Sequence, residues 1–242
     1  MRCRRPRSCE SSSAAAASTI EVSGKRIELL IEGLEQAYPD AVCELDYRTP
    51  WELLVATVLS AQCTDQRVNQ VTPAVFEQWP GPAELAQATQ DELETVIRST
   101  GLHRSKAKNL RQTARRIAQE NQGEVPCDLD ALIGLPGVGR KTAKVVLGEA
   151  FGLAAGVAVD THVRRLANRL GLSLASDPER VAADLEALVP KEQWIDLSKR
   201  LVLHGRRVCR ARRPACDGCV LVPSCDRVGV ETQGAEPAPS LK

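Results

Sequence analysis

The chain has 242 residues, of which 43% are hydrophobic and only 3% aromatic. It is long enough for one large core or two smaller ones, built mainly from Leu, Val, Ile and Ala. The formal net charge of +1 identifies no partner by itself. No apolar run is long enough to cross a membrane, and no hydrophobic signal core follows the N-terminus. We therefore expect a globular protein without a membrane anchor.

Residues 1–19 are rich in Arg, Ser and Ala and have no apolar period, so we expect a flexible N-terminal extension. Their single acidic residue also fits an organelle transit peptide, which is the less favoured interpretation. From Ser23 onward the apolar residues fall at helical spacing, up to the stop at Pro39.

The next helix is predicted from Thr49-Pro50-Trp51-Glu52, which combines a capping box with proline at the first helical position. It is apolar on nearly all sides through Leu59, so we expect it to be central and buried. Further helices are predicted at 66–78, 82–88, 91–99, 105–119, 128–133, 141–151, after Asp160, at 178–188 and at 191–206. No strand-like alternation of useful length appears, and the predicted class is all-α.

The segment Leu135–Ala143 (LPGVGRKTA) predicts a hairpin between two helices. Gly137 and Gly139 supply positive φ or a close backbone approach. The following helix begins with free backbone N–H groups beside three cations, so it offers a seat for a phosphate. The spacing fits neither a Walker A loop nor a dinucleotide fingerprint. The three cations are Arg140, Lys141 and Lys144.

Basic residues are concentrated in two further segments. Residues 103–116 hold six Lys or Arg and no acid, and residues 191–213 hold eight against two acids. One such cluster on its own is most simply a solvated helix face. Several clusters near glycine turns indicate a basic surface that binds phosphates.

Four of the nine cysteines crowd together near the C-terminus, in the spacing C-x6-C-x2-C-x5-C. A chain of this length does not need disulfides, so the cluster indicates a metal site in a reducing compartment. Tetrahedral zinc and an iron–sulfur cluster both accept four thiolates, and the spacing does not decide between them. The four are Cys209, Cys216, Cys219 and Cys225.

Together these motifs resemble the endonuclease III family of DNA glycosylases, within the helix-hairpin-helix superfamily. The resemblance spans about residues 24–228. It is based on LSAQ-x-TD (59–65), GL-x-x-SKA (101–107), the hairpin, VDTH (159–162), LHGR (203–206) and the cysteine spacing.

The resemblance implies two helical lobes with a DNA-binding cleft between them. A six-helix barrel would occupy residues 43–153, and a second lobe would combine residues 20–42 with 154–228. The second lobe would hold a 4Fe-4S cluster on the four cysteines, and it is the resemblance that favours iron–sulfur over zinc. The tail, 229–242, has no apolar period and is expected to be disordered.

The resemblance also implies the activity: a monomeric base excision repair enzyme that removes oxidised pyrimidines from double-stranded DNA and cleaves the abasic site by β-elimination. It further implies a cytoplasmic, nucleoid-associated bacterial protein. Lys141 matches the family's Schiff-base nucleophile and Asp160 its catalytic carboxylate. An adenine-mismatch glycosylase of the same fold is the nearest alternative, but such enzymes lack the hairpin lysine. A non-catalytic DNA-binding or redox-sensing iron–sulfur protein is the second, and would need neither residue.

Base removal requires the nucleotide to be flipped out of the duplex and the resulting gap to be filled. By resemblance, Gln62 and Leu102 are the gap-filling residues. Without the resemblance they would be an ordinary polar helix end and a core leucine. Other DNA contacts are expected from the hairpin backbone and from basic or histidine side chains, namely Gly137, Gly139, Arg140, Lys144, His162 and Arg206.

Overall fold

The computed structural model describes residues 22–230, and this part of the chain contains helices and no strand, which confirms the all-α prediction. The expectations for residues 1–19 and for most of 229–242 lie outside the described residues. The α-helices are α1 (Gly24–Ala37), α2 (Pro50–Leu59), α3 (Asp65–Gln78), α4 (Pro82–Gln87), α5 (Gln90–Ile97), α6 (His103–Glu120), α7 (Leu129–Ile133), α8 (Arg140–Phe151), α9 (Thr161–Arg169), α10 (Pro178–Leu188) and α11 (Trp194–Arg207).

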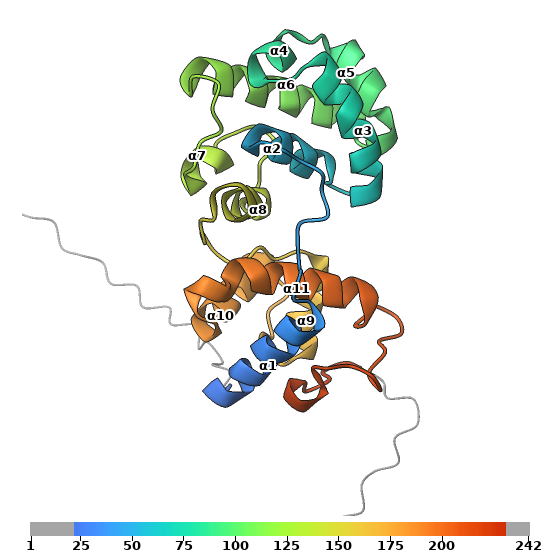
Figure 1. The fold of residues 1–242 in the computed structure, drawn as a ribbon, viewed down its shortest axis with the longest axis vertical. Helices are drawn as coiled ribbons and strands as arrows, with labels where there is room; N and C mark the ends of the chain where they lie inside the picture. The colour runs from blue at the N-terminus through green and yellow to red at the C-terminus, as the bar shows by residue number, and fades with distance from the viewer. Residues whose placement is uncertain (1–21, 231–242) are drawn as a thin grey trace, which may run out of the picture.

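The helices form two groups, seen one above the other in Figure 1. We call α2–α8 the hairpin lobe, and α1 with α9–α11 and residues 208–230 the cysteine lobe. Each has its own buried hydrophobic cluster. The first draws on residues between Leu45 and Leu147, and the second on Ile27–Tyr38 together with residues between Val157 and Leu221. Helix α1 thus packs beside helices more than a hundred residues away in sequence.

Helix α2 is the centre of the hairpin lobe, and every residue from Trp51 to Leu59 is buried. Its N-terminus differs in one detail from the predicted capping box. Thr49 accepts from the backbone N–H of Glu52, as expected, but the Glu52 carboxylate accepts from the N–H of Arg48 rather than that of Thr49. The reciprocal capping box occurs instead at Thr89 and Glu92, where it was not predicted.

Two of the predicted helices are replaced by a 3-10 turn at one end. The segment predicted at 91–99 is α5 followed by a 3-10 turn, Arg98–Thr100, because Gly101 follows with a φ of 70° and stops the helix. The segment predicted at 191–206 begins with a 3-10 turn, Lys191–Gln193, before α11. Among the described residues, no helix combines the length and apolar character needed to cross a membrane.

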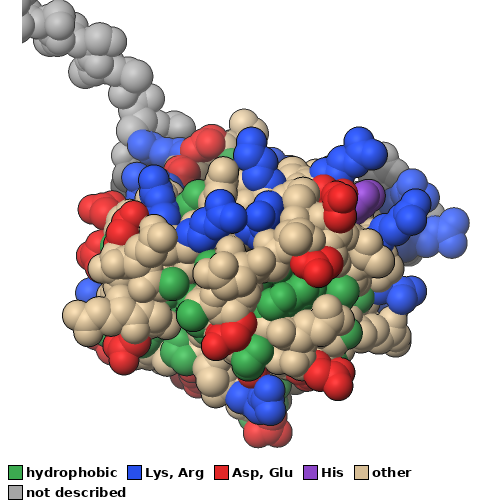
Figure 2. Space-filling model, turned by 90° about the horizontal axis from the view of Figure 1, so that it is seen from above, with side chains coloured by type: hydrophobic (Ala, Val, Ile, Leu, Met, Phe, Trp, Pro, Cys, Tyr) green, Lys and Arg blue, Asp and Glu red, His purple; other side chains and the backbone are tan. Residues whose placement is uncertain are grey.

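The basic stretch of α6 is less available to a ligand than its composition indicates. Figure 2 shows Lys and Arg gathered over one half of the face seen from above. Several cations of α6, however, donate to main-chain carbonyls: Arg111 to Ala88, Arg115 to Ala86 and Arg116 to Gly134. These bonds join α6 to the ends of its neighbours, so much of this charge serves the packing of the lobe.

Candidate active site

The predicted hairpin joins α7 to α8, but its two glycines differ. Gly137 has a φ of +78°, and a Cβ there would lie 2.7 Å from the Asn109 side-chain amide nitrogen. Gly139 is the N-cap of α8 with a φ of −87°, and nothing lies within 4 Å of a Cβ placed on it. Gly137 is therefore required by the fold, whereas Gly139 leaves open space at a helix N-terminus.

This difference predicts unequal costs for the two alanine substitutions. Gly137→Ala adds left-handed strain to a clash, so we expect it to lower the free energy of unfolding by about 2–3 kcal/mol. Gly139→Ala is expected to cost less than about 1 kcal/mol, because only an N-cap preference is lost. Urea unfolding of both variants measures the difference, and equal losses would contradict the assignment of Gly137 as the structural glycine.

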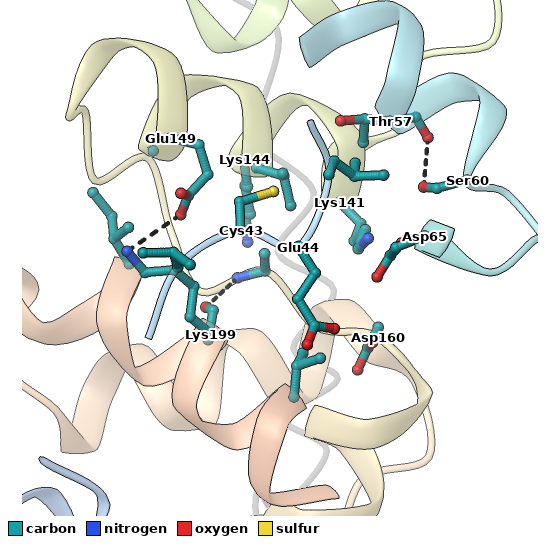
Figure 3. A pocket seen from close by; sticks show the side chains of 18 of the residues that line it. Cys43, Glu44, Thr57, Ser60, Asp65, Lys141, Lys144, Glu149, Asp160 and Lys199 are labelled. Atoms are coloured by element: carbon teal, nitrogen blue, oxygen red, sulfur yellow. Dashed lines mark hydrogen bonds and ion pairs between the residues drawn. The ribbon is translucent and has the colours of Figure 1, made fainter. Parts of the chain in front are cut away.

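A cavity of about 120 Å³ lies where the two lobes meet. It is lined from above by α2 and α8, from below by α11, and at its edge by Asp160 just before α9. Figure 3 shows Lys141 entering from α8 toward the side occupied by Asp65 and Asp160. The structure thus brings the two predicted catalytic residues to one cavity, although the rest of α8 and the loop after it separate them in the sequence.

Most ionisable side chains that line this cavity are neutralised by an ion pair. Lys144 Nζ lies 3.1 Å from Glu186 Oε1, and Lys199 Nζ lies 3.5 Å from Glu149 Oε1. Arg206 pairs with Asp65 at 2.8 Å and also with Glu44. These pairs connect the hairpin lobe and the segment before it to the cysteine lobe.

Burial shifts the pKa of two side chains that line the cavity, Glu149 and Cys43. It raises the pKa of the Glu149 carboxyl, while the nearby Lys199 ammonium acts in the opposite direction. Burial likewise raises the pKa of the Cys43 thiol. Cys43 and the Glu149–Lys199 pair were not singled out from the sequence. They lie far apart along the chain and carry no local motif, so only the packing of the lobes could identify them.

Lys141 and Asp160 differ from these neighbours, because neither forms an ion pair with another described residue of the chain. Asp160 is the N-cap of α9: its Oδ1 accepts from the backbone N–H groups of His162 and Val163, both at 2.8 Å. Lys141 is an exposed residue in the first turn of α8, which contains no acid. A cation at that end opposes the helix dipole, so its position is not explained by stability.

Three of the side chains predicted to contact DNA interact with other residues of the chain in this structure. Lys144 is turned inward, donating to Glu186 and to the Val157 carbonyl, because the neighbouring lobe places a carboxylate within its reach. Arg206 is held by its two carboxylates. His162 packs against Gly205 of α11 and contacts Arg165. Lys144 and Arg206 therefore already have ionic partners within the chain, and their contact with DNA stays a prediction.

Arg140, Gln62 and Leu102 are exposed, as a DNA contact requires. Arg140 lies 3.9 Å from Glu179, and both of these side chains are more than half exposed. Gln62 and Leu102 both have positive φ, at 55° and 48°, which is uncommon for residues other than glycine. Leu102 is not the core leucine that it would be without the resemblance.

The four clustered cysteines line one small cavity in the cysteine lobe, together with apolar side chains. His204 Nε2 lies 3.3 Å from Cys219 Sγ, and burial lowers the pKa of His204 to about 4. The Arg169 guanidinium donates to Cys209 Sγ at 3.4 Å. Within residues 22–230, no three His, Cys, Asp or Glu side chains converge closely enough to hold a single metal ion. The thiols instead surround a shared space.

Comparison with known proteins gives consistent matches. The family model described as HhH-GPD superfamily base excision DNA repair protein matches residues 55–191. The chain is 53% identical to Endonuclease III of Synechocystis sp. over 192 residues, covering 79% of this chain and 88% of the relative. It is 41% identical to Endonuclease III of Escherichia coli K12 over 202 residues, covering 84% and 95%.

Two solved structures match the fold over most of both chains. One is a non-covalent Endonuclease III–DNA complex, with a TM-score of 0.81 and 43% identity over 86% of this chain and 97% of that chain. The other is a trapped Endonuclease III–DNA covalent intermediate, with the same TM-score and 42% identity over the same shares. The chain therefore belongs to the endonuclease III family, within the HhH-GPD superfamily of base excision DNA repair proteins.

Proposed function

We propose that this protein is a bifunctional DNA glycosylase and abasic-site lyase of base excision repair, acting on double-stranded DNA. One observation carries the proposal: Lys141 and Asp160 line the same cavity between the lobes, and neither is paired with another charge of the described chain. Membership of the endonuclease III family supports the same activity. The relatives named above are bacterial, and we propose a monomer acting at the DNA in the cytoplasm.

The chemistry needs a nucleophilic amine and a fixed negative charge. The neutral Lys141 amine attacks the sugar C1′, a C–N bond forms, and the bond to the damaged base breaks, with the base leaving with its electron pair. The proton that Asp160 takes from the Lys141 amine passes to O4′ as the sugar ring opens, which gives a protonated Schiff base. The Asp160 carboxylate then accepts a C2′ proton as the C3′–O bond breaks, and the 3′ phosphate leaves by β-elimination. The Asp160 carboxylate stabilises positive charge that develops at C1′ and accepts a proton from the Lys141 amine.

The two lobes have separate tasks in this proposal. Residues 43–153 present the hairpin, whose backbone N–H groups at Gly137 and Gly139 bind phosphates beside exposed Arg140. The second lobe, built from 20–42 and 154–228, supplies Asp160 and the floor of the cavity. Gln62 and Leu102 fill the gap left by the flipped nucleotide, for which their exposure and shape are suited.

The size of the cavity supports a small flipped base as its occupant. Its volume of about 120 Å³ is well below the roughly 300–1,000 Å³ of cavities for drug-sized ligands. We propose oxidised pyrimidines as the substrates, since these have a single ring. The Glu149–Lys199 pair on the wall offers hydrogen-bonding groups to the edge of such a base.

We further propose that the four clustered cysteines hold a 4Fe-4S cluster. The cysteine spacing fits zinc and iron–sulfur alike, and the resemblance to the endonuclease III family favours iron–sulfur. A shared cavity lined by four thiols suits a larger centre in which each iron takes one thiolate. When bound, such a cluster would fix the shape of the basic segment 206–213, which comprises the end of α11 and the loop after it.

Cys216→Ser is expected to abolish the visible absorbance of the iron–sulfur cluster and to lower the iron content of the purified protein. It should also make residues 208–228 easier to cleave with a protease, since the loop loses its anchor. Cys127→Ser, at an exposed position outside the cavity, is the matched control and should keep wild-type iron. One zinc per wild-type chain, without iron, would overturn the assignment.

The catalytic proposal is tested by incubating the protein with a duplex that contains one abasic site, in the presence of sodium borohydride. Reduction of a Schiff base leaves a stable protein–DNA adduct, and peptide mapping should place the DNA on Lys141. The undamaged duplex is the control and should give no adduct. If binding to abasic DNA is intact but no adduct forms, the protein is a monofunctional glycosylase or a non-catalytic DNA-binding protein.

A further inference from the structure

Lys106 is a buried cation to which no step of the proposed mechanism assigns a task. It lies in the first turns of α6 and is only 4% exposed. Its ammonium donates to two backbone carbonyls, those of Leu59 and Thr100, each at 2.8 Å. Burial lowers the pKa of Lys106, so the site holds a charge at a cost in free energy. An apolar side chain would fill the same volume without this cost, so the ammonium itself needs an explanation.

The two carbonyls belong to segments that are about forty residues apart in the sequence. Leu59 is the last residue of α2, and its carbonyl precedes the loop that carries Gln62. Thr100 ends the 3-10 turn before the loop that carries Leu102. One ammonium therefore bridges the base of both loops, each within three residues of a proposed gap-filling side chain.

Both loops hold a non-glycine residue in the left-handed region, at Gln62 and Leu102. This backbone conformation is strained for such residues and persists only where the surroundings fix it. Both side chains are exposed, so their own packing contributes little to holding them there. Main-chain hydrogen bonds close each loop locally, from the Cys63 N–H to the Ser60 carbonyl and from the Lys106 N–H to the Leu102 carbonyl. The Lys106 ammonium beneath them is the contact that joins one loop to the other.

We propose that Lys106 is a positioning residue that sets the spacing and orientation of the Gln62 and Leu102 loops, so that both side chains enter the duplex together. This inference rests on the proposed function, because it presupposes that Gln62 and Leu102 fill the gap left by the flipped nucleotide. Lys106 touches neither substrate nor reacting atoms; it acts through the two loops. A lysine suits the task because one ammonium has three donors and can serve both carbonyls.

The test uses Lys106→Met, which keeps the length and burial of the side chain but removes its donors. We expect the single-turnover rate of base excision to fall by about 100-fold, the size of effect that a 1 Å misplacement can produce. Binding to undamaged duplex should change less than about 3-fold, because phosphate contacts dominate it. With 2-aminopurine opposite a non-cleavable abasic analogue, the wild-type fluorescence change on binding should be lost.

The decisive comparison is the same substitution in a Gln62→Ala/Leu102→Ala background. If Lys106 acts through these side chains, Lys106→Met should there lower the rate by less than about 3-fold, since coupled residues are non-additive. An equal loss in both backgrounds would overturn the proposal. Ile117→Val, buried on the same helix, is the control for stability alone and should leave the fluorescence change intact.

Two further outcomes are distinguishable. A wild-type protein that gives no borohydride adduct contradicts the proposed function itself, whereas a normal wild type with an unaffected Lys106→Met variant contradicts only the role of Lys106. Where Lys106→Met does not fold, Lys106→Gln, which keeps a shorter NH₂ donor, carries the same comparison in both backgrounds.

Discussion

Lys141→Ala is expected to abolish the borohydride adduct on abasic DNA and to lower base excision by about 10⁴-fold or more, as removal of a covalent nucleophile does in other enzymes. The variant should not be less stable than the wild type. Lys141 lies in a helix first turn that contains no acid, where the dipole opposes a cation. Alanine should therefore leave the free energy of unfolding unchanged or raise it by up to about 1 kcal/mol.

The chain contains a matched control for this substitution. Lys25 is the second residue of α1, as Lys141 is the second residue of α8, and it too is exposed in a first turn without an acid. Lys25→Ala should change stability in the same direction and leave the adduct intact. An adduct that survives Lys141→Ala would assign the Schiff base to another amine and remove the central residue of the proposal.

The helices were predictable because their signals are local. A helix start is marked by a capping residue directly before the helix, in two cases followed by proline. The structure places helix N-termini at all three such sites, Thr49-Pro50, Asp160 and Asp177-Pro178. The ends were less predictable. Gly101 stops α5 through a 3-10 turn, which depends on a positive φ that composition alone does not specify.

The sequence did not predict which basic side chains are buried, which form ion pairs and which have no ionic partner. Lys106, Lys141 and Lys144 all lie in basic helix starts and look alike. In the structure Lys106 is buried under two loops, Lys144 pairs with Glu186 from the other lobe, and Lys141 has no ionic partner among the described residues. Which lysine meets a carboxylate is decided by the packing of one lobe on the other, and no local spacing encodes that contact.

Asp160→Asn should separate the two roles of the Asp160 carboxylate, which caps the N-terminus of α9 and places a negative charge at the cavity. One oxygen of Asp160 accepts the backbone N–H groups of His162 and Val163, and an asparagine oxygen can accept the same bonds. We therefore expect the free energy of unfolding to change by less than about 1 kcal/mol. The charge at the cavity is lost, and excision should fall by about 10²–10³-fold, as when one preorganised electrostatic group is removed.

Asp160→Ala completes the comparison, because it removes the cap together with the charge. It should match Asp160→Asn in single-turnover rate and cost about 1 kcal/mol more in urea unfolding. A near-wild-type rate for Asp160→Asn would mean that Asp160 only caps α9. The negative charge would then have to come from another carboxylate that lines the cavity: Asp65 and Glu44 are paired with Arg206, and Glu149 is paired with Lys199. That pairing is why the structure favours Asp160 as the catalytic carboxylate.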